Sequence, residues 1–257
     1  MPASPTTAVD KALALIEAVA TTGRPLRLSE VAERVGLHRA TAHRVLADLV
    51  GRGWILRLGD HYLPGPALLR LSRATAAATT SLTGIARPVL EDLAAVTGMM
   101  ANLQVATTGG SRVVDVVRPA RLAMISDLRD ELLAAHRFAG PLALVAAMDA
   151  EARAPYLRAA EDDDHRLQGP DGLLAALDHA ASSGFALQRG SNQPLVGSLS
   201  HVVTTTAGSG PVCALTLVGP IAEFDDAALP TLRIQLTAAT DRLGRELLAL
   251  TARQDER

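Results

Sequence analysis

The stretch RVGLHRATAHRVLADLVGRGW, residues 34–54, decides how the first part of the chain folds. Gly36 marks a tight turn, and Gly51 and Gly53 mark the end of the segment that follows it. Within that segment, apolar residues recur at the spacing of one helical face: Ala42, Val45, Leu46 and Leu49. The pattern predicts a helix with an apolar face that packs inward and a polar face that points outward.

The neighbouring segments complete a small domain. Residues 9–20 and 29–35 each carry one apolar stripe at helical spacing, and a turn containing glycine and proline separates them. Residues 54–63 have the pattern of two short strands around a turn. Helix, helix, turn, helix and β-hairpin is the order of a winged helix-turn-helix, which we expect at residues 1–65.

The outward face of the third helix has the composition of a DNA-reading surface. Ala40 and Arg44 lie opposite the apolar stripe at 100° per residue. Small side chains allow close approach to the major groove, an arginine can donate two hydrogen bonds to a guanine edge, and free N–H groups at the helix start suit a phosphate. An arginine in the hairpin would lie beside the adjacent backbone or minor groove. The predicted DNA-binding residues are Arg39, Ala40, Thr41, His43, Arg44 and Arg57.

Composition and charge are those of a folded protein outside the secretory route. Of the 257 residues, 48% are hydrophobic and 20% are charged, and no apolar run reaches the roughly 18–20 residues of a membrane span. The first residues lack the pattern of a signal peptide, and a single cysteine cannot form an internal disulfide. We therefore expect a cytoplasmic protein. Residues 1–64 hold eight basic and six acidic side chains in a chain of net charge -2, which suits a local contact with a polyanion.

The rest of the chain alternates between helical and strand-like segments. Residues 66–80 form a connecting helix, whose apolar side would pack either on its own domain or, as we favour, on a second copy. From residue 81 onward, turns separate consecutive strand-like segments, which predicts an antiparallel sheet in an α+β domain. The expected strands are at 99–107, 111–118, 121–126, 185–188, 198–206 and 211–219, and the expected helices at 81–98, 139–149, 151–160, 171–182 and 225–252.

No sequence motif points to catalysis, a cofactor or a metal. The chain has no phosphate-binding loop, no nucleophile elbow and no paired Cys or His spacing for zinc. Alternation along a strand would place Ser198 and Ser200 on one face and His201 on the other, which argues against a Ser/His pair. The acidic run at 161–166 reads as a solvated loop, and Cys213 as part of an apolar core. The alternative function is a metabolite-binding protein or enzyme whose N-terminal domain is only a packing module.

Several segments, taken together, resemble the IclR (isocitrate lyase regulator) family of bacterial transcription factors. They occur in the family's order: LSEVAERVGLHRATAHRVLADLVGRGWI, YLPGPALLRLSRA, ARPVLEDLAAVTG, GFALQRGSNQP and PVCALTLVGP. The resemblance implies a winged-helix DNA-binding domain at 1–65, a linker helix at 66–80 and a GAF-like effector-binding and oligomerisation domain at 81–257. It also implies a homodimer or dimer of dimers, with reading helices ~34 Å apart on a promoter palindrome. Such regulators repress or activate transcription, and many respond to small organic acids or aromatic metabolites, so the resemblance implies a small-molecule effector such as an organic or aromatic acid.

The effector domain departs from the family pattern. Where members usually have His-Ala-Thr-Ala-x-Gly-Lys, residues 135–141 read AHRFAGP, and the acidic pair expected near residues 191–203 is absent. We therefore expect a different effector from that of well-matched members. Leu103 and Cys213 fit the core of the sheet equally well. By position, the expected pocket residues are Met99, Ala101, Leu103, His136, Phe138, Ala139, Gly140, Ser198, Ser200 and Cys213.

Overall fold

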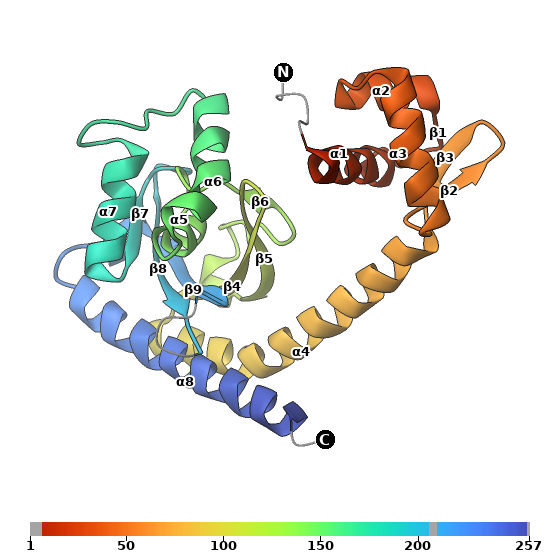
Figure 1. Ribbon diagram of the computed structural model, residues 1–257. Helices are drawn as coiled ribbons and strands as arrows, with labels where there is room; N and C mark the ends of the chain where they lie inside the picture. The colour runs from red at the N-terminus through yellow and green to blue at the C-terminus, as the bar shows by residue number, and fades with distance from the viewer. Residues whose placement is uncertain (1–6, 206–209, 256–257) are drawn as a thin grey trace. The chain divides into compact units, whose positions relative to one another are not determined.

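The chain divides into two compact units, residues 1–78 and residues 79–257 (Figure 1). The computed structural model describes the backbone of residues 7–205 and 210–255, and the side chains of all of these except 72–81 and 251–255. Each unit has its own hydrophobic core.

The N-terminal unit is a helix-turn-helix with a small sheet. Its elements are α1 (Ala8–Thr21), β1 (Leu26–Arg27), α2 (Leu28–Val35), α3 (Arg39–Gly51), β2 (Ile55–Leu58) and β3 (His61–Pro64). The strands form an antiparallel sheet in the order β1-β3-β2. The predicted order of helices and hairpin is confirmed.

Local signals set the helix boundaries in this unit. The Thr7 hydroxyl accepts a hydrogen bond from the Asp10 N–H, and the Asp10 carboxylate accepts one from the Thr7 N–H, so α1 starts with a capping box. Gly36 ends α2 at φ 69°, a left-handed conformation that favours glycine, and the chain turns there into α3. The buried core includes Leu15, Leu26, Val31, Ala42, Leu46 and Ile55.

The C-terminal unit is built on a six-stranded antiparallel sheet in the order β6-β5-β4-β9-β8-β7. Its strands are β4 (Met100–Thr107), β5 (Gly110–Val117), β6 (Leu132–Leu133), β7 (Ala186–Arg189), β8 (Val196–Val203) and β9 (Cys213–Pro220). Its helices are the part of α4 (Pro66–Thr97) that follows residue 78, α5 (Ala139–Ala146), α6 (Ala150–Asp162), α7 (Leu173–Ser183) and α8 (Leu229–Asp255), with 3-10 turns at Ala120–Leu122 and Ile221–Phe224. The predicted α+β class with an antiparallel sheet is confirmed.

Helices cover both faces of this sheet (Figure 1). The C-terminal half of α4 and most of α8 pack on one face through an apolar core that includes Leu90, Leu103, Leu215 and Leu236. α5 and α7 lie over the other face, and α5 is buried along its whole length because α6, α7 and the sheet surround it. The central strands β4 and β9 are therefore enclosed on both sides.

Two predicted elements differ from the observed ones. Residues 121–126, expected as a strand, form the end of a 3-10 turn and part of a loop. Arg121 makes two hydrogen bonds with the Glu223 carboxylate and one with the Gly98 carbonyl, and these contacts hold the segment outside the sheet, whose edge strand is β6. The helices expected at 66–80 and 81–98 are one continuous helix, α4.

We expected helix 66–80 to pack against a second copy of the chain. Most of the side chains that this prediction concerns, those from residue 72 onward, lie outside the described residues. In the described part of the chain, no helix has an apolar stretch long enough to cross a membrane.

We predict that Leu46→Ala destabilises the N-terminal unit by roughly 2–5 kcal/mol, because it removes a fully buried side chain from α3. The only tryptophan of the chain, Trp54, is half-buried against this core, so its fluorescence during urea unfolding reports on this unit. The matched control is Leu13→Ala in α1, where the side chain is 54% exposed. An equal loss of stability in both variants would contradict the assigned core.

Candidate functional site

The structure brings the predicted reading residues of α3 together on one exposed face. Ala42, Leu46 and Leu49 are buried in the core, while Arg39, Ala40, His43 and Arg44 are exposed and Thr41 is half-buried. The first turn of α3 is also exposed. His38 precedes it as the N-cap, and its Nδ1 accepts a long hydrogen bond of 3.4 Å from the Ala40 N–H. The face thus combines small residues, cationic residues and an accessible helix start.

Arg57 lies away from α3 on strand β2 and is exposed. Its Nε donates a hydrogen bond of 3.0 Å to the Gly59 carbonyl, and its guanidinium carbon lies 6.0 Å from the centre of the Tyr62 ring. These contacts hold the side chain against the hairpin and fix the position of its positive charge.

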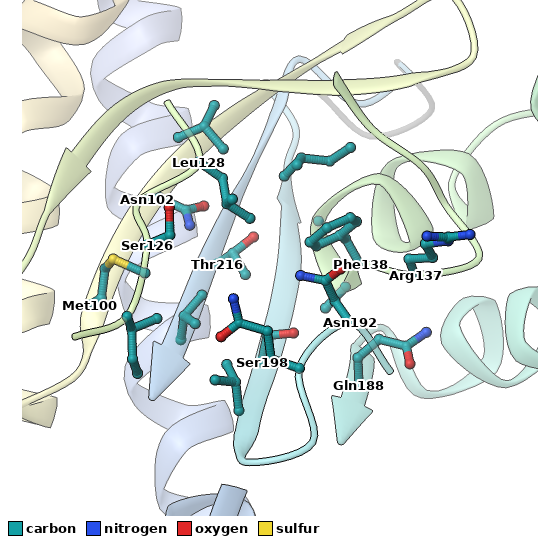
Figure 2. Close-up of a pocket in the computed structure, with 18 of the residues that line it drawn as sticks. Met100, Asn102, Ser126, Leu128, Arg137, Phe138, Gln188, Asn192, Ser198 and Thr216 are labelled. Carbon is teal, nitrogen blue, oxygen red and sulfur yellow. The ribbon is translucent and has the colours of Figure 1, made fainter. Parts of the chain in front are cut away.

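The second candidate site is a pocket in the C-terminal unit (Figure 2). Strands β4, β8 and β9 form its floor, the start of α5 closes one side, and the segment 125–128 closes another. Its lining residues with polar or aromatic side chains include Asn102, Gln104, Ser126, Phe138, Asn192, Ser198 and Thr216.

The pocket contains part of the predicted set. Phe138, Ala139, Gly140 and Ser198 line it. Four more residues of the set lie on the opposite face of the sheet, buried in the core against α4 and α8: Met99, just before β4, and Ala101, Leu103 and Cys213 in the strands. Burial there raises the pKa of the Cys213 thiol to about 12, so the thiol stays protonated.

At β4, the residues predicted to line the pocket are each one position before the residues that do line it. Side chains on a strand alternate between faces, so the pocket face of β4 carries Met100, Asn102 and Gln104 instead of their neighbours. The placement of Asn102 and Gln104 in the pocket was missed. The signal that could have found them is a pair of polar residues two apart in an otherwise apolar strand.

The two remaining predicted residues lie next to the pocket. Ser200 is buried on the same face of β8 as Ser198, outside the lining, and its hydroxyl donates to the Leu215 carbonyl. His136 is buried in an adjoining cavity, where its Nε2 lies 3.2 Å from the Asp163 carboxylate and its ring stacks on His165 at 4.7 Å. Burial, and secondly the charge of His165, lowers the pKa of His136.

A buried hydrogen-bond network underlies the floor. The Gln104 amide donates to the Asn102 side-chain oxygen at 2.9 Å and to the Thr216 hydroxyl at 3.2 Å, and its own oxygen accepts from Ser111 at 2.7 Å. Thr216 in turn donates to the Ser200 hydroxyl at 3.0 Å. Buried polar groups linked in this way hold one another in fixed orientations. The part of the floor that these residues form is therefore polar, uncharged and rigid.

The loop that closes the pocket is strained and tied to α4. Leu128 and Asp130 have φ angles of 49° and 64°, which non-glycine residues rarely adopt and which cost roughly 1–3 kcal/mol each. Between them, the Arg129 guanidinium lies 3.6 Å from the buried Asp115 carboxylate. The same carboxylate oxygen lies 2.9 Å from Arg87 of α4. One buried charge therefore contacts both the loop and the helix.

The Ser/His combination and the acidic run that the sequence presents have the following positions. Ser200 points into the floor network, whereas His201 lies on the other face of β8 and contacts the Thr240 hydroxyl at 2.8 Å, so the two cannot act on one substrate. Asp162, Asp163 and Asp164, in the acidic run, are exposed. Among the described residues, no three His, Cys, Asp or Glu side chains are arranged to hold a metal ion.

Comparison with known sequences finds a match for the N-terminal unit. Residues 8–59 match the sequence profile of the IclR helix-turn-helix domain. The N-terminal unit is therefore similar to IclR helix-turn-helix domains. No curated protein matches the chain in sequence. The resemblance stated from the sequence is thus confirmed for the domain that contains α3.

Solved structures extend the likeness in fold to nearly the whole chain. A putative IclR transcriptional regulator from Silicibacter sp. TM1040 is similar with a TM-score of 0.65 at 21% identity, over 94% of this chain and 96% of that one. The IclR of Thermotoga maritima gives 0.58 at 18% identity over 93% and 98%. An IclR homologue from Microbacterium hydrocarbonoxydans, solved with 4-hydroxybenzoate, gives 0.57 at 19% identity over 95% and 100%. These similarities show that the chain has the fold of IclR-type proteins.

We predict that Gly140→Ala destabilises the C-terminal unit by roughly 1–3 kcal/mol. A Cβ atom at Gly140 would lie 2.0 Å from the Gln104 side-chain oxygen, and the network around Gln104 prevents this side chain from moving aside. The control is Gly84→Ala in α4, where a Cβ atom meets nothing within 4 Å and stability should rise by about 0.5–1 kcal/mol. Thermal unfolding followed by circular dichroism measures both, and a neutral Gly140→Ala would contradict the assigned contact.

We also predict that the C-terminal unit loses stability as the pH falls below about 6.5. Burial lowers the pKa of His201 from its ordinary value of 6.5, although Asp241 partly opposes the shift. The unfolded chain therefore binds a proton that the folded chain excludes, and the free energy of unfolding falls on acidification. His136 shifts in the same direction. Urea unfolding between pH 7.5 and 5.5 should show a shallower decline for His201→Gln than for wild type, and equal declines would refute the prediction.

Proposed function

We propose that the chain is a DNA-binding transcriptional regulator of the IclR type and not an enzyme. The observation that carries this proposal is the exposed face of α3, where Arg39, Ala40, His43 and Arg44 lie beside an accessible helix start inside an IclR helix-turn-helix domain. A helix of this kind enters the major groove, with Arg44 reading a base edge and Arg39 contacting a phosphate. Thr41 and Arg57 complete the proposed DNA-binding set.

The C-terminal unit serves in this proposal as the effector-binding part. Its pocket has a rigid polar floor, an aromatic wall at Phe138 and a strained loop over it, which suit the capture of a small molecule. A fold neighbour is solved with 4-hydroxybenzoate, and organic or aromatic acids are the effectors that the family resemblance implies. The proposed division is a DNA-binding domain at 1–65, a linker helix at 66–80 and an effector domain at 81–257.

The regulator acts in this proposal as a homodimer or a dimer of dimers in the cytoplasm. Two copies would place their α3 helices about 34 Å apart, one turn of DNA, and so bind a pseudo-palindrome in a promoter. Effector binding would change the affinity for that site and thereby repress or activate transcription.

We predict that the full chain binds DNA from upstream of its own gene and that the affinity falls steeply with salt. Arg44→Ala should weaken specific binding by roughly 1–3 kcal/mol, because the base contact is lost. Fluorescence anisotropy with the labelled promoter fragment measures both effects.

The matched control is Arg52→Ala, which removes the same charge from an exposed position just past the other end of α3. We expect this variant to retain specific binding. Insertion of about half a helical turn, ~5 base pairs, between half-sites should abolish cooperative binding by a dimer. Absence of specific binding, or equal losses in the two variants, would contradict the proposed reading face.

A further inference from the structure

The charge of the pocket lining restricts the class of effector. Of the side chains that line the pocket, only Asp127 and Arg137 carry a charge. The others are apolar, amide or hydroxyl side chains. A buried ionic ligand requires an opposite charge beside it, because desolvation of an unpaired ion is costly. The positions of these two residues therefore decide whether an acid can bind.

Arg137 directs its charge away from the pocket. Its Nε donates a hydrogen bond of 3.2 Å to Nε2 of His136, and its guanidinium lies 3.8 Å from the Asp163 carboxylate. The side chain is 53% exposed, and Figure 2 shows it at the edge of the pocket, with its nitrogens turned away from Thr216 and the floor. A carboxylate on the floor would find no cation there.

Asp127 adds a negative charge to the wall of the pocket. It is half-buried in the loop over the pocket, and its carboxylate accepts a long hydrogen bond of 3.4 Å from the Arg129 N–H. The Arg129 guanidinium itself is directed to Asp115. Asp127 therefore repels an anion in the pocket.

The start of α5 does not replace the missing cation. Its first turn faces the pocket through Ala139 and Gly140, whose N–H groups precede the helical hydrogen bonds, but Pro141 has no N–H. The Gln104 oxygen lies against this turn, since a Cβ atom at Gly140 would be 2.0 Å from it. This partial negative charge offsets the positive end of the helix dipole.

The floor nevertheless provides a hydrogen-bond donor for an uncharged acceptor group of a ligand. Asn102 is only 4% exposed and lines the pocket, and its oxygen is occupied by Gln104. Its amide nitrogen has no hydrogen-bond partner among the described residues. A carbonyl oxygen placed over the floor would accept from this nitrogen without bringing a net charge into the pocket.

We infer that the effector presents an uncharged carbonyl group, such as a carboxamide, to the floor at Asn102, and that the pocket discriminates against the corresponding carboxylate. This inference rests on the proposed effector role of the pocket and specifies its ligand class. The half-buried Ser198 and the exposed Asn192 line the same pocket and can bind the remaining polar atoms of the amide.

The test compares acids and amides of the same shape on the full-length chain at pH 7.5. The pairs are acetamide and acetate, benzamide and benzoate, and 4-hydroxybenzamide and 4-hydroxybenzoate. Calorimetry or ligand-observed NMR should show at least one amide binding about tenfold or more tightly than its acid. Equal or tighter binding of the acids, or no binding by any of the amides, overturns the inference.

Two variants connect the preference to the pocket. Asp127→Asn removes the negative charge from the pocket lining and should lower the ratio of amide affinity to acid affinity. Asp130→Asn makes the same change in the same loop but outside the lining, and it should leave this ratio unchanged. Ser198→Leu should fill the pocket and abolish amide binding. Retention of amide binding in Ser198→Leu, or equal ratios in the two loop variants, contradicts the assignment.

The outcome is independent of the DNA-binding test. If the chain binds its promoter but prefers acids, the inferred ligand class is wrong and the proposed regulator stands. If the amide preference holds but no promoter fragment binds, the pocket chemistry stands and the proposed regulator is wrong.

Discussion

The burial of β4 and β9 on both faces is the constraint on which the C-terminal unit depends. One face of these strands must be apolar, because α4 and α8 close over it. The other face carries Asn102, Gln104 and Thr216, which are buried and are joined by hydrogen bonds between their side chains. The polar network is thus a condition for folding as well as the floor of a pocket. Its rigidity follows from the same hydrogen bonds that permit its burial.

The sequence was sufficient to predict the N-terminal unit. The stripe of Ala42, Leu46 and Leu49 and the left-handed turn at Gly36 act over short distances, and each leaves a periodic or residue-specific signal. The pocket depends instead on the registration of strands far apart in the chain. In β4, alternation separates Asn102 and Gln104 from Ala101 and Leu103, but both faces are buried, so the pattern alone did not show that the polar face lines the pocket. Met99, Ala101 and Leu103 were therefore expected where Met100, Asn102 and Gln104 lie.

The loop over the pocket could not be predicted for a different reason. Residues 121–126 have the apolar pattern of a strand, but long-range contacts of Arg121 with Glu223 and Gly98 determine their path. Arginines hold this region at other points as well, since Arg118 donates to the Ile125 carbonyl and Arg112 to that of Asp130. The contacts of Arg121 join residues distant in sequence, and none of these side-chain contacts leaves a local periodic pattern.

Asp115 has a consequence for the movement of this loop. Its carboxylate is 3% exposed and is neutralised by Arg129 of the loop and Arg87 of α4. If the loop lifts away, the same negative charge remains buried with Arg87 as its only cationic partner, beside the hydrogen bond that it accepts from the Val116 N–H. Movement of the loop would therefore change the strength of the ion pair between Asp115 and Arg87 of α4, because both contacts use the same carboxylate. A substitution at Asp115 would uncouple them while leaving the pocket lining chemically intact.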